Sequence, residues 1–399
     1  MHFRTFNVEA RSRVLCVSAR DGVPVSTQWD PRGYYYPTQI AQYALSHYSS
    51  HVSNENLAEE KTVIEDGNRR ADIDDQNAKR ILDEESDSMV IEFKNTLTLP
   101  VSSTHVVVNF DFKNLNGATF KIFLQTDSSN EIILHYHPID DFLVRRHGEV
   151  VFGFGSSEDE DWIRVTRDVT NDLEKTLSFL KTPIVNFKKL RSSVRVKKIQ
   201  FSGHGRVANI SVSAAEHRRM FLHGAEWFVE NQDSVTGGWS TPVTFNKEQK
   251  KYPGAEEIKS GWYGAMCQGQ AISVLVRAYL ETKDDRFLTA AENGVKVFNI
   301  SSKDGGVRAV FMEKFEWYEE YPTNPSTFIL NGFMYSLLGL YDLKSVSVRL
   351  KAEVRRLYHS GLRSLEAMLP LYDTGAGTFY DLRHFTMKTA PKVSVLTMK

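Results

Sequence analysis

The sequence has few cysteines, no excess of charge of either sign and no long hydrophobic run. Only two of its 399 residues are cysteines, Cys16 and Cys267, and their wide separation fits neither a disulfide scaffold nor a cysteine metal site. The formal net charge is −1, so no overall field attracts nucleic acid, and we expect no nucleic-acid partner. No apolar stretch approaches the roughly 18 residues that a membrane span requires.

Several common catalytic motifs are missing as well. The sequence contains no P-loop, no GxGxxG in a strand context, no GxSxG and no HExxH. These absences argue against nucleotide-dependent chemistry, a serine hydrolase and a zinc protease, and no organic cofactor is expected. His135 and His137 alternate on one strand face without carboxylates at ligand spacing, so the metal-ligand set is left unassigned.

Charge alternates with apolar residues from the first residues onward. In MHFRTFNVEARSRV, the side chains of Glu9, Arg11 and Arg13 share one face of a period-two pattern, which predicts a strand. The segment lacks the hydrophobic region of a signal peptide. We therefore expect the chain to begin inside a domain, with a targeting segment missing from its start.

Three compositional regions divide the chain. Residues 1–53 combine a short strand region with a helical pattern near 33–49. Residues 54–213 begin with a polar, acidic stretch at 54–88, expected to be a loop, and continue with short Val-, Ile- and Phe-rich runs. Asn116-Gly117 predicts a tight hairpin, and residues 171–181 predict a helix. The middle region therefore predicts a β-sandwich or barrel.

Residues 214–399 have helical periodicity, with a repeat about every 70 residues. NQDSVTGGW, SKDGGVRAVF and LYDTGAGTFY are Asp-containing, Gly-rich turns that close on an aromatic residue. Helix pairs whose loops gather at one end are typical of an (α/α) toroid. Because this region has room for only part of a ring, we expect an incomplete toroid whose open face suits a long polymeric ligand.

The stretch WYEEYPTNPSTFILNGFMYSLLGLYDL places Glu319 and Glu320 between two tyrosines. Asn324-Pro325 predicts a helix start, because an N-cap residue precedes a proline. The carboxyl groups would then lie at the helix N-terminus, where the dipole favours anions. Two interpretations stay open: a carboxylate–tyrosine pair for proton transfer, or a solvated acidic loop that caps the helix.

The same predicted helix has two distinct faces. Gly332, Ser336 and Gly339 form a row of small residues that would allow a neighbouring helix to approach closely. Asn331 and Tyr335 are four residues apart and share another face.

Two further stretches contain candidate polar residues. In LYDTGAGTFYDLRHF, Tyr380 is a candidate acid or base, and Arg383 could neutralise a substrate carboxylate or instead pair with a nearby aspartate. In STQWDPRGYYYPTQIAQY, neutral hydrogen-bonding groups suit sugar hydroxyls, but an ordinary helix surface explains them as well.

Four stretches together closely resemble the D-glucuronyl C5-epimerase family of heparan sulfate and heparin biosynthesis. They are residues 317–343, GWYGAMCQGQAISVLVRAYL, AMLPLYDTGAGTFYDLRHF and STQWDPRGYYYPTQIAQYALSHYS. The resemblance implies an N-terminal β-hairpin, a β-sandwich or barrel and a partial (α/α) barrel. It implies conversion of D-glucuronate to L-iduronate within the polymer, by removal and return of the C5 proton. An N-sulfated heparosan-type substrate, a homodimer, contacts with other heparan sulfate biosynthetic enzymes and a Golgi location at the membrane or in the lumen are also implied.

The resemblance also implies roles for particular residues. The catalytic residues correspond to Glu320, Tyr321 and Tyr380. The substrate-binding residues correspond to Arg11, Arg13, Gln28, Tyr36, Gln39, Gln42, Asn331, Tyr335 and Arg383. The loop would therefore deliver the acid–base pair, and the helix behind it would line a groove.

The sequence departs from the family pattern in two places. After Ala390-Pro391 the family continues with a second catalytic tyrosine and a closing helix, whereas this chain reads KVSVLTMK. We therefore expect impaired inversion by the chain as it stands. The family binds calcium, but Ala208 stands where an aspartate is expected, and the sequence does not place the other ligands.

Two other functions fit the same residues. A uronate polysaccharide lyase would also remove the C5 proton, but would then eliminate the 4-linked sugar. A non-catalytic glycan-binding protein, or a partner that dimerises with an active enzyme, would bind polymer without exchanging a proton.

Overall fold

A computed structural model describes residues 7–53, 60–66, 70–73, 76–84, 87–127, 131–156, 161–182, 187–245, 256–387 and 393–394. The chain forms two compact units. The first comprises Met1–Ser26 and His47–Met220, and the second comprises Thr27–Ser46 and Phe221–Lys399. Residues 1–53 thus contribute to both units, and the division into three domains stays a prediction.

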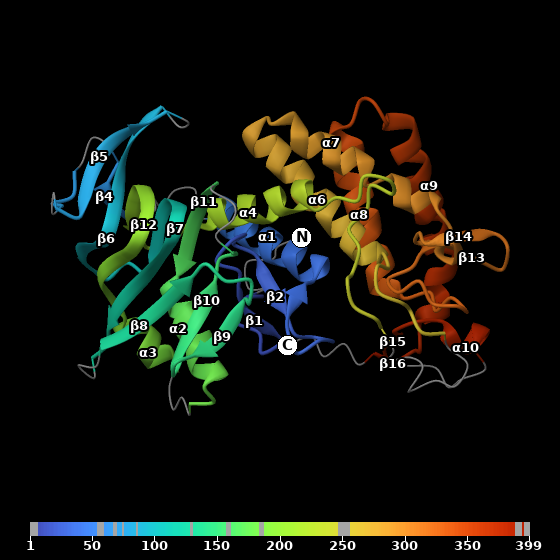
Figure 1. Ribbon diagram of the computed structural model, residues 1–399. Helices are drawn as coiled ribbons and strands as arrows, with labels where there is room; N and C mark the ends of the chain where they lie inside the picture. Colours follow the sequence, from blue (N-terminus) through green and yellow to red (C-terminus); the bar gives the residue numbers. More distant parts are fainter. Residues whose placement is uncertain are drawn as a thin grey trace. The chain divides into compact units, whose positions relative to one another are not determined.

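The first unit is built on two long antiparallel strands, β7 and β12 (Figure 1). Each has 19 residues and pairs with three other strands, so the sheet branches at both of them. Its main strand order is β5-β6-β12-β7-β8-β10-β9, with β11 on β7 and β4 on β12. The strands are β4 (Lys61–Glu65), β5 (Ala78–Asp83), β6 (Ser88–Ser103), β7 (Val107–Gln125), β8 (Glu131–His137), β9 (Leu143–Arg146), β10 (Glu149–Gly153), β11 (Trp162–Asp168) and β12 (Arg195–Ser213).

A hairpin of β1 (Val14–Val17) and β2 (Pro24–Ser26) precedes this sheet. The predicted N-terminal hairpin is therefore confirmed, but the strand predicted around Glu9, Arg11 and Arg13 is wrong. Residues 8–13 form turns, in which the Arg11 amide donates to the Val8 carbonyl over 3.1 Å. The alternating charges do not make a strand because no neighbouring strand pairs with these described residues.

The hairpin predicted at Asn116-Gly117 is also wrong, because β7 continues through it. The register with β12 shifts here, so that Gly117 lies opposite His204 while Asn114 lies opposite Gly205. Gly117 has φ +58°, and the Asn114 side-chain oxygen accepts from the Ala118 amide over 2.7 Å. A bulge and a tight turn both favour a left-handed glycine, so local sequence cannot separate them.

Of two more expectations for this unit, one is wrong in part and the other is confirmed. The stretch 54–88 is not a loop throughout, because its described residues include β4 and β5, which pair with β12 and β6. The predicted helix at 171–181 is confirmed as α2 (Val169–Phe179), capped by Asp168, whose carboxylate accepts from the Thr170 and Asn171 amides. A short helix, α3 (Phe187–Ser193), precedes β12.

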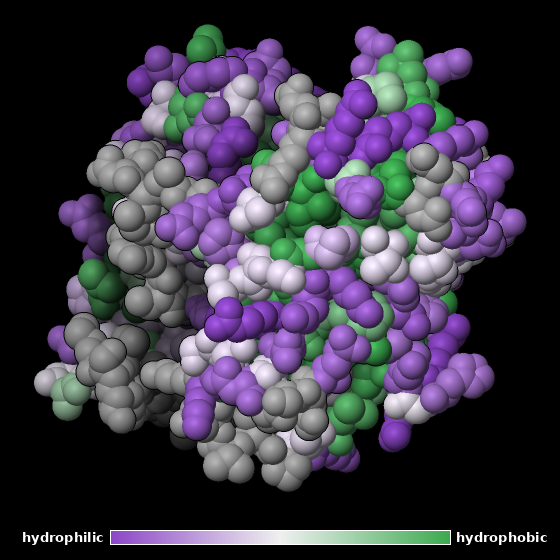
Figure 2. All heavy atoms as spheres, turned by 90° about the vertical axis from the view of Figure 1, so that its left-hand side faces the viewer, coloured by the Kyte–Doolittle hydropathy of each residue, from purple (hydrophilic) through white to green (hydrophobic). Residues whose placement is uncertain are grey.

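Phenylalanine dominates the core of the first unit. The rings of Phe93, Phe110, Phe112, Phe120 and Phe201 are fully buried and contact one another across β6, β7 and β12. The side chains between these phenylalanines are mostly half-buried on β7 and β12, and several are exposed on β6. Figure 2 shows a face on which hydrophilic residues predominate, with smaller hydrophobic areas between them.

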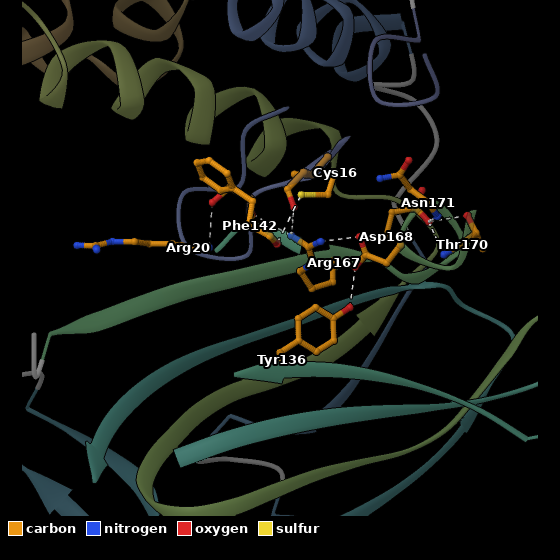
Figure 3. A network of polar contacts seen from close by, with 11 residues as sticks. Cys16, Arg20, Tyr136, Phe142, Arg167, Asp168, Thr170 and Asn171 are labelled. Atoms are coloured by element: carbon orange, nitrogen blue, oxygen red, sulfur yellow. Dashed lines mark hydrogen bonds and ion pairs between the residues drawn. The ribbon is translucent and has the colours of Figure 1, made fainter. Parts of the chain in front are cut away.

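A buried polar network joins the hairpin to the sheet (Figure 3). Arg167 donates to both carboxylate oxygens of Asp172, over 2.8 and 2.5 Å, and to the backbone carbonyls of Val17 and Ser18. The Tyr136 hydroxyl donates to Asp172 over 2.6 Å. Because all three side chains are buried, the network satisfies charges that would otherwise be costly and fixes β1 against β11 and α2.

The second unit is mainly helical. Its helices are α1 (Pro37–Ser53), α4 (His217–Glu230), α6 (Ala265–Thr282), α7 (Asp285–Asn293), α8 (Leu330–Val346), α9 (Lys351–Met368) and α10 (Arg383–Thr386), of which α1 and α4 continue into the first unit. Three 3₁₀ turns, η1 (Lys296–Asn299), η2 (Ser302–Asp304) and η3 (Leu369–Tyr372), lie between them. Short strands are β3 (Tyr34–Tyr35), β13 (Arg308–Phe311), β14 (Phe315–Tyr318), β15 (Thr378–Phe379) and β16 (Val393–Ser394).

Helix α8 packs closely on α6 through small residues, as the sequence predicts. A Cβ on Gly339 would lie 2.1 Å from the Gly269 carbonyl oxygen, and a Cβ on Gly269 would lie 2.4 Å from the Ser336 Cα. Glycine is therefore required at this crossing on both helices.

The three predicted Gly-rich turns do lie between helices or short strands. In the first, the Asp233 carboxylate accepts from the Val235 and Thr236 amides, and in the third, the Asp373 carboxylate accepts from the Gly375 amide. A toroid stays a prediction. Among the described helices, none combines the length and the apolar character needed to cross a membrane.

Candidate active site

The β13–β14 hairpin delivers the Glu319-Glu320-Tyr321 loop. Two aromatic residues at the end of β14 anchor it: Trp317 stacks on Phe333 of α8 with ring centroids 3.6 Å apart, and Tyr318 donates to the Leu357 carbonyl over 2.8 Å. The loop that follows is buried, since Glu319 is 0% and Glu320 8% exposed. A solvated acidic loop is therefore excluded, and the alternative of a buried carboxylate–tyrosine group agrees with the structure.

Glu320 lies beside two phenols. The Tyr380 hydroxyl donates to Glu320 Oε1 over 3.5 Å. Burial and then the negative charge of Glu320 raise the pKa of Tyr321 well above its ordinary value, so this phenol keeps its proton. Gly332 makes room for the carboxyl group, because a Cβ there would lie 2.6 Å from Glu320 Oε2.

An aromatic cluster holds the ring of Tyr321. Phe245 stacks on it with centroids 4.5 Å apart and planes within 4°, while Trp262 lies at 5.6 Å and Trp29 at 6.4 Å. Trp29 also contacts Tyr36 at 5.0 Å. The ring of Trp29 therefore packs against aromatic residues of its own protein, and the cluster restricts the direction of the Tyr321 hydroxyl.

The segment before and within the start of α1 supplies neutral polar groups. Tyr36 and Gln42 are each 7% exposed, and Gln39 is 1% exposed. Both side-chain polar atoms of Gln39 lack a hydrogen-bond partner, which is unusual for a buried amide. Burial raises the pKa of Tyr36 above its ordinary value, with Glu320 a further charge that raises it. Gln28, just before this segment, is half-buried.

Helix α8 contributes Asn331 and Tyr335, but it starts later than predicted. It begins at Leu330, six residues after Asn324, so the helix start predicted at Asn324-Pro325 is wrong. The intervening segment is held by backbone pairing with a distant one, since Leu382 donates to the Thr327 carbonyl and Leu330 donates to the Tyr380 carbonyl. Asn331 Oδ1 is buried without a partner, and burial raises the pKa of half-buried Tyr335.

Arg383 pairs with Asp381, as one of the two sequence interpretations holds. Its guanidinium Nε donates to both carboxylate oxygens over 2.8 Å, and the two side chains are 1% and 0% exposed. A contact between Arg383 and a substrate carboxylate stays a prediction. Arg11 and Arg13 belong to the first unit, and their substrate contacts likewise stay predictions.

Sequence reasoning missed three residues of this site. Phe245 and Trp262 pack around Tyr321, and Glu319 lies directly behind Glu320. No local signal identifies Phe245, which is far from Tyr321 in the chain. The pair of adjacent glutamates did signal Glu319, but not that its side chain is completely buried.

Calcium binding stays a prediction, because the structure does not place its ligands among the described residues. They contain no group of three or more His, Cys, Asp or Glu side chains that could hold a metal ion. Next to Ala208, where the family has an aspartate, the Asn209 side chain donates to the Asp111 carboxylate over 2.7 Å. Arg164 and Arg219 lie 3.5 and 3.4 Å from the same carboxylate. The residues present do not fit a calcium site there, and no chemical step is assigned to calcium.

Comparisons with known proteins identify relatives of the whole chain. Residues 86–204 match the family described as the D-glucuronyl C5-epimerase beta-sandwich domain, and residues 232–396 match the D-glucuronyl C5-epimerase C-terminus. An uncharacterised protein of Methanocaldococcus jannaschii is 32% identical over 127 residues, which are 31% of this chain and 41% of that protein. A mutant of a family 29 carbohydrate-binding module covers 40% of this chain and 95% of its own, at 13% identity and a TM-score of 0.22, too low to support an argument.

A D-glucuronyl C5-epimerase of Caenorhabditis elegans gives the most extensive of these matches. It is 34% identical over 98% of this chain and 72% of its own length. Since both domain matches agree with this relative, the chain belongs to the D-glucuronyl C5-epimerase family.

Proposed function

We propose that this chain inverts C5 of D-glucuronate residues within a polysaccharide, giving L-iduronate. The observation that carries the proposal is the contact between Tyr380 and Glu320, beside Tyr321, in a member of this family. A carbon acid needs a group that takes its proton and a group that returns one. One carboxylate between two phenols provides both.

The reaction breaks the C5–H bond and forms it again on the opposite face of the ring. In the first step the proton leaves to the Glu320–Tyr380 pair, and the bonding electrons move into the sugar carboxyl group. In the second step C5 takes a proton from Tyr321, whose raised pKa keeps its phenol protonated at rest. The enolate-like intermediate carries added charge, which buried hydrogen-bond donors stabilise better than water does.

The neutral groups around this cluster support a sugar ligand. Gln39 presents an amide without a protein partner, and Asn331 presents a carbonyl oxygen without one. Buried polar atoms of this kind are costly unless a ligand or water satisfies them. We assign Gln28, Tyr36, Gln39, Gln42, Asn331 and Tyr335 to the sugar hydroxyls, with Arg11, Arg13 and Arg383 near the acidic groups of the polymer.

We further propose an N-sulfated heparosan-type polymer as the substrate, a homodimer as the working form, contacts with other enzymes of heparan sulfate synthesis, and a Golgi location. The support for these assignments is the resemblance of residues 317–343 and the family membership.

The test incubates the purified chain with N-sulfated heparosan in deuterated water and follows C5 by NMR. Because the acid and base regain and lose protons through solvent, inversion must place deuterium at C5. Because Tyr380, Glu320 and Tyr321 together can supply both a base and an acid, we expect deuterium together with iduronate, in contrast to the impaired inversion that the sequence alone predicts. Deuterium without iduronate would limit the chain to proton exchange on one face of the sugar ring. An ultraviolet-absorbing unsaturated product would identify a lyase instead, and binding without exchange a glycan-binding protein.

A further inference from the structure

Glu319 is a completely buried carboxylic acid that directly precedes Glu320, the proposed base, in the chain. Its backbone is fixed on two sides, since its amide donates to the Val307 carbonyl and its carbonyl accepts from the Ala265 amide, each over 2.8 Å. Its side chain contacts the segment that precedes α8: Oε1 accepts from the Phe328 amide over 3.1 Å, and Oε2 has no hydrogen-bond partner. The proposed chemistry does not use this carboxyl group.

The Thr327–Phe328 turn that Glu319 holds is connected to the Tyr380 segment. Phe328 has φ +55°, a conformation that a phenylalanine adopts only when its surroundings impose it. On one side of the turn, the Thr327 carbonyl accepts from the Leu382 amide over 2.9 Å. On the other side, the Leu330 amide donates to the Tyr380 carbonyl over 3.2 Å.

We propose that Glu319 is a positioning residue, which holds the segment that carries Tyr380 at the correct distance from the loop that carries Glu320. Its side chain and that of Glu320 leave adjacent residues of one loop, so the anchor and the base move together. Two backbone hydrogen bonds connect the turn to the Tyr380 segment, so a displacement of the loop would also displace Tyr380. The inference rests on the proposed function for its consequence, but its structural part can be tested without activity.

The protonation of Glu319 indicates which variant should replace it. Burial, followed by the charges of Asp381 and Glu320, raises the pKa of Glu319 to about 8. At neutral pH the side chain is therefore mainly an uncharged acid that accepts a hydrogen bond from Phe328. A glutamine has the same shape and keeps this acceptor, whereas a leucine fills similar space without it.

The experiment compares Glu319→Gln and Glu319→Leu with the unchanged chain and with Glu292→Gln. Glu292 is a matched control, because it is also a buried carboxylate of the second unit, 5% exposed, but bonds Ser347 and Arg349. Amide hydrogen exchange is read by mass spectrometry in peptides that cover 327–333 and 378–384. C5 deuterium incorporation into N-sulfated heparosan gives kcat and KM for each variant.

We expect Glu319→Leu to lose protection in both peptides together and to lower kcat about 100-fold with KM changed less than about threefold, as for a displaced catalytic group. Glu319→Gln should keep the protection and stay within about fivefold of the unchanged kcat. Glu292→Gln should leave both peptides and kcat per folded molecule unaltered.

Other outcomes would overturn the inference. Unchanged protection in Glu319→Leu would show that the turn does not depend on this side chain. Equal losses in Glu319→Gln and Glu319→Leu would show that the hydrogen bond accepted from the Phe328 amide is not what holds the turn, and equal losses in Glu292→Gln would mean a general effect of stability. If the unchanged chain exchanges no deuterium, the proposed function fails, while the protection of the two peptides still decides the role of Glu319.

Discussion

At the scale of single residues, the phenol of Tyr380 provides the most direct test of the chemistry. Its hydroxyl contacts Glu320 at 3.5 Å, and Tyr380→Phe removes only that oxygen. We expect C5 deuterium exchange to fall about 10²–10⁴-fold, the usual contribution of a group that transfers the proton. Exchange rates per folded molecule, measured by NMR in deuterated water, check this.

Tyr318→Phe is the matched control for this change. Tyr318 is buried whereas Tyr380 is half-buried, and the Tyr318 hydroxyl donates to the Leu357 carbonyl of α9. The control should lose about 1 kcal/mol of stability, the net value of one hydrogen bond, and keep its exchange rate. Similar rates for Tyr380→Phe and Tyr318→Phe would remove Tyr380 from the mechanism.

The buried acid Glu319 should also make stability depend on pH. Its pKa rises from 4.5 to about 8 on folding, so between these values the folded state binds more protons than the unfolded state. Stability then falls as pH rises through this window, by up to about 1.4 kcal/mol per pH unit from this group.

Denaturant unfolding of the unchanged chain and of Glu319→Gln, at pH 5.5, 6.5 and 7.5, measures this contribution. Glutamine does not titrate, so the stability of the unchanged chain should fall relative to the variant as pH rises. A constant difference would show that Glu319 is ionised throughout. Glu9, whose pKa burial raises to about 7, acts in the same direction in both proteins and cancels in the comparison.

At the scale of elements, the crossing of α6 and α8 depends on Gly339. In Gly339→Ala the new methyl group would lie 2.1 Å from the Gly269 carbonyl oxygen, which is backbone and cannot rotate away. We expect a net loss of about 1–3 kcal/mol from overpacking, despite the better helix propensity of alanine. Chemical denaturation measures it.

Gly361→Ala in α9 is the control for the crossing. There the nearest atom to the added methyl group is Leu337 Cδ2, at 2.5 Å, the end of a flexible side chain. A loss clearly smaller than that of Gly339→Ala is expected. If the two losses were equal, the backbone contact between the helices would not be the cause.

The elements also show what the sequence could predict and what it could not. The sequence predicts helix α2 within two residues at each end, because the helical pattern lies within the segment itself, and the Asp168 cap that fixes its start is seen in the structure. The sequence misplaces the start of α8 because Leu382 and Tyr380, fifty or more residues away, pair with Thr327 and Leu330. Asn116-Gly117 predicts a tight turn, but a bulge favours the same left-handed glycine conformation, and the local sequence does not distinguish the two.

The site shows the same division. Glu320, Tyr321 and Tyr380 were identified through a family resemblance, and the structure brings Tyr380 and Glu320 into contact. The stacking of Phe245 on Tyr321 could not be predicted, because nothing in either segment specifies a partner so distant in the chain. The sequence allows Arg383 to contact a substrate carboxylate or to pair with a nearby aspartate. Only the structure, in which it is buried and paired with Asp381, favours the second interpretation.

At the scale of the whole molecule, the chain has two compact units with separate cores. The phenylalanine core and the Arg167 network belong to the first unit, and the α6–α8 crossing belongs to the second. Arg167→Met leaves Asp172 buried without its cation, for which we expect a loss of about 3–5 kcal/mol. Because Arg167 and Asp172 both belong to the first unit, we expect this loss of stability to affect the first unit only.

Differential scanning calorimetry can separate the units if each unfolds as its own cooperative block. Arg167→Met should then lower the midpoint of one transition and leave the other in place, and Gly339→Ala should lower the other. The exchange data assign the transitions, because the peptides of β7 and of α8 lose protection at different temperatures. A single transition that both variants shift equally would show that the chain unfolds as one cooperative block.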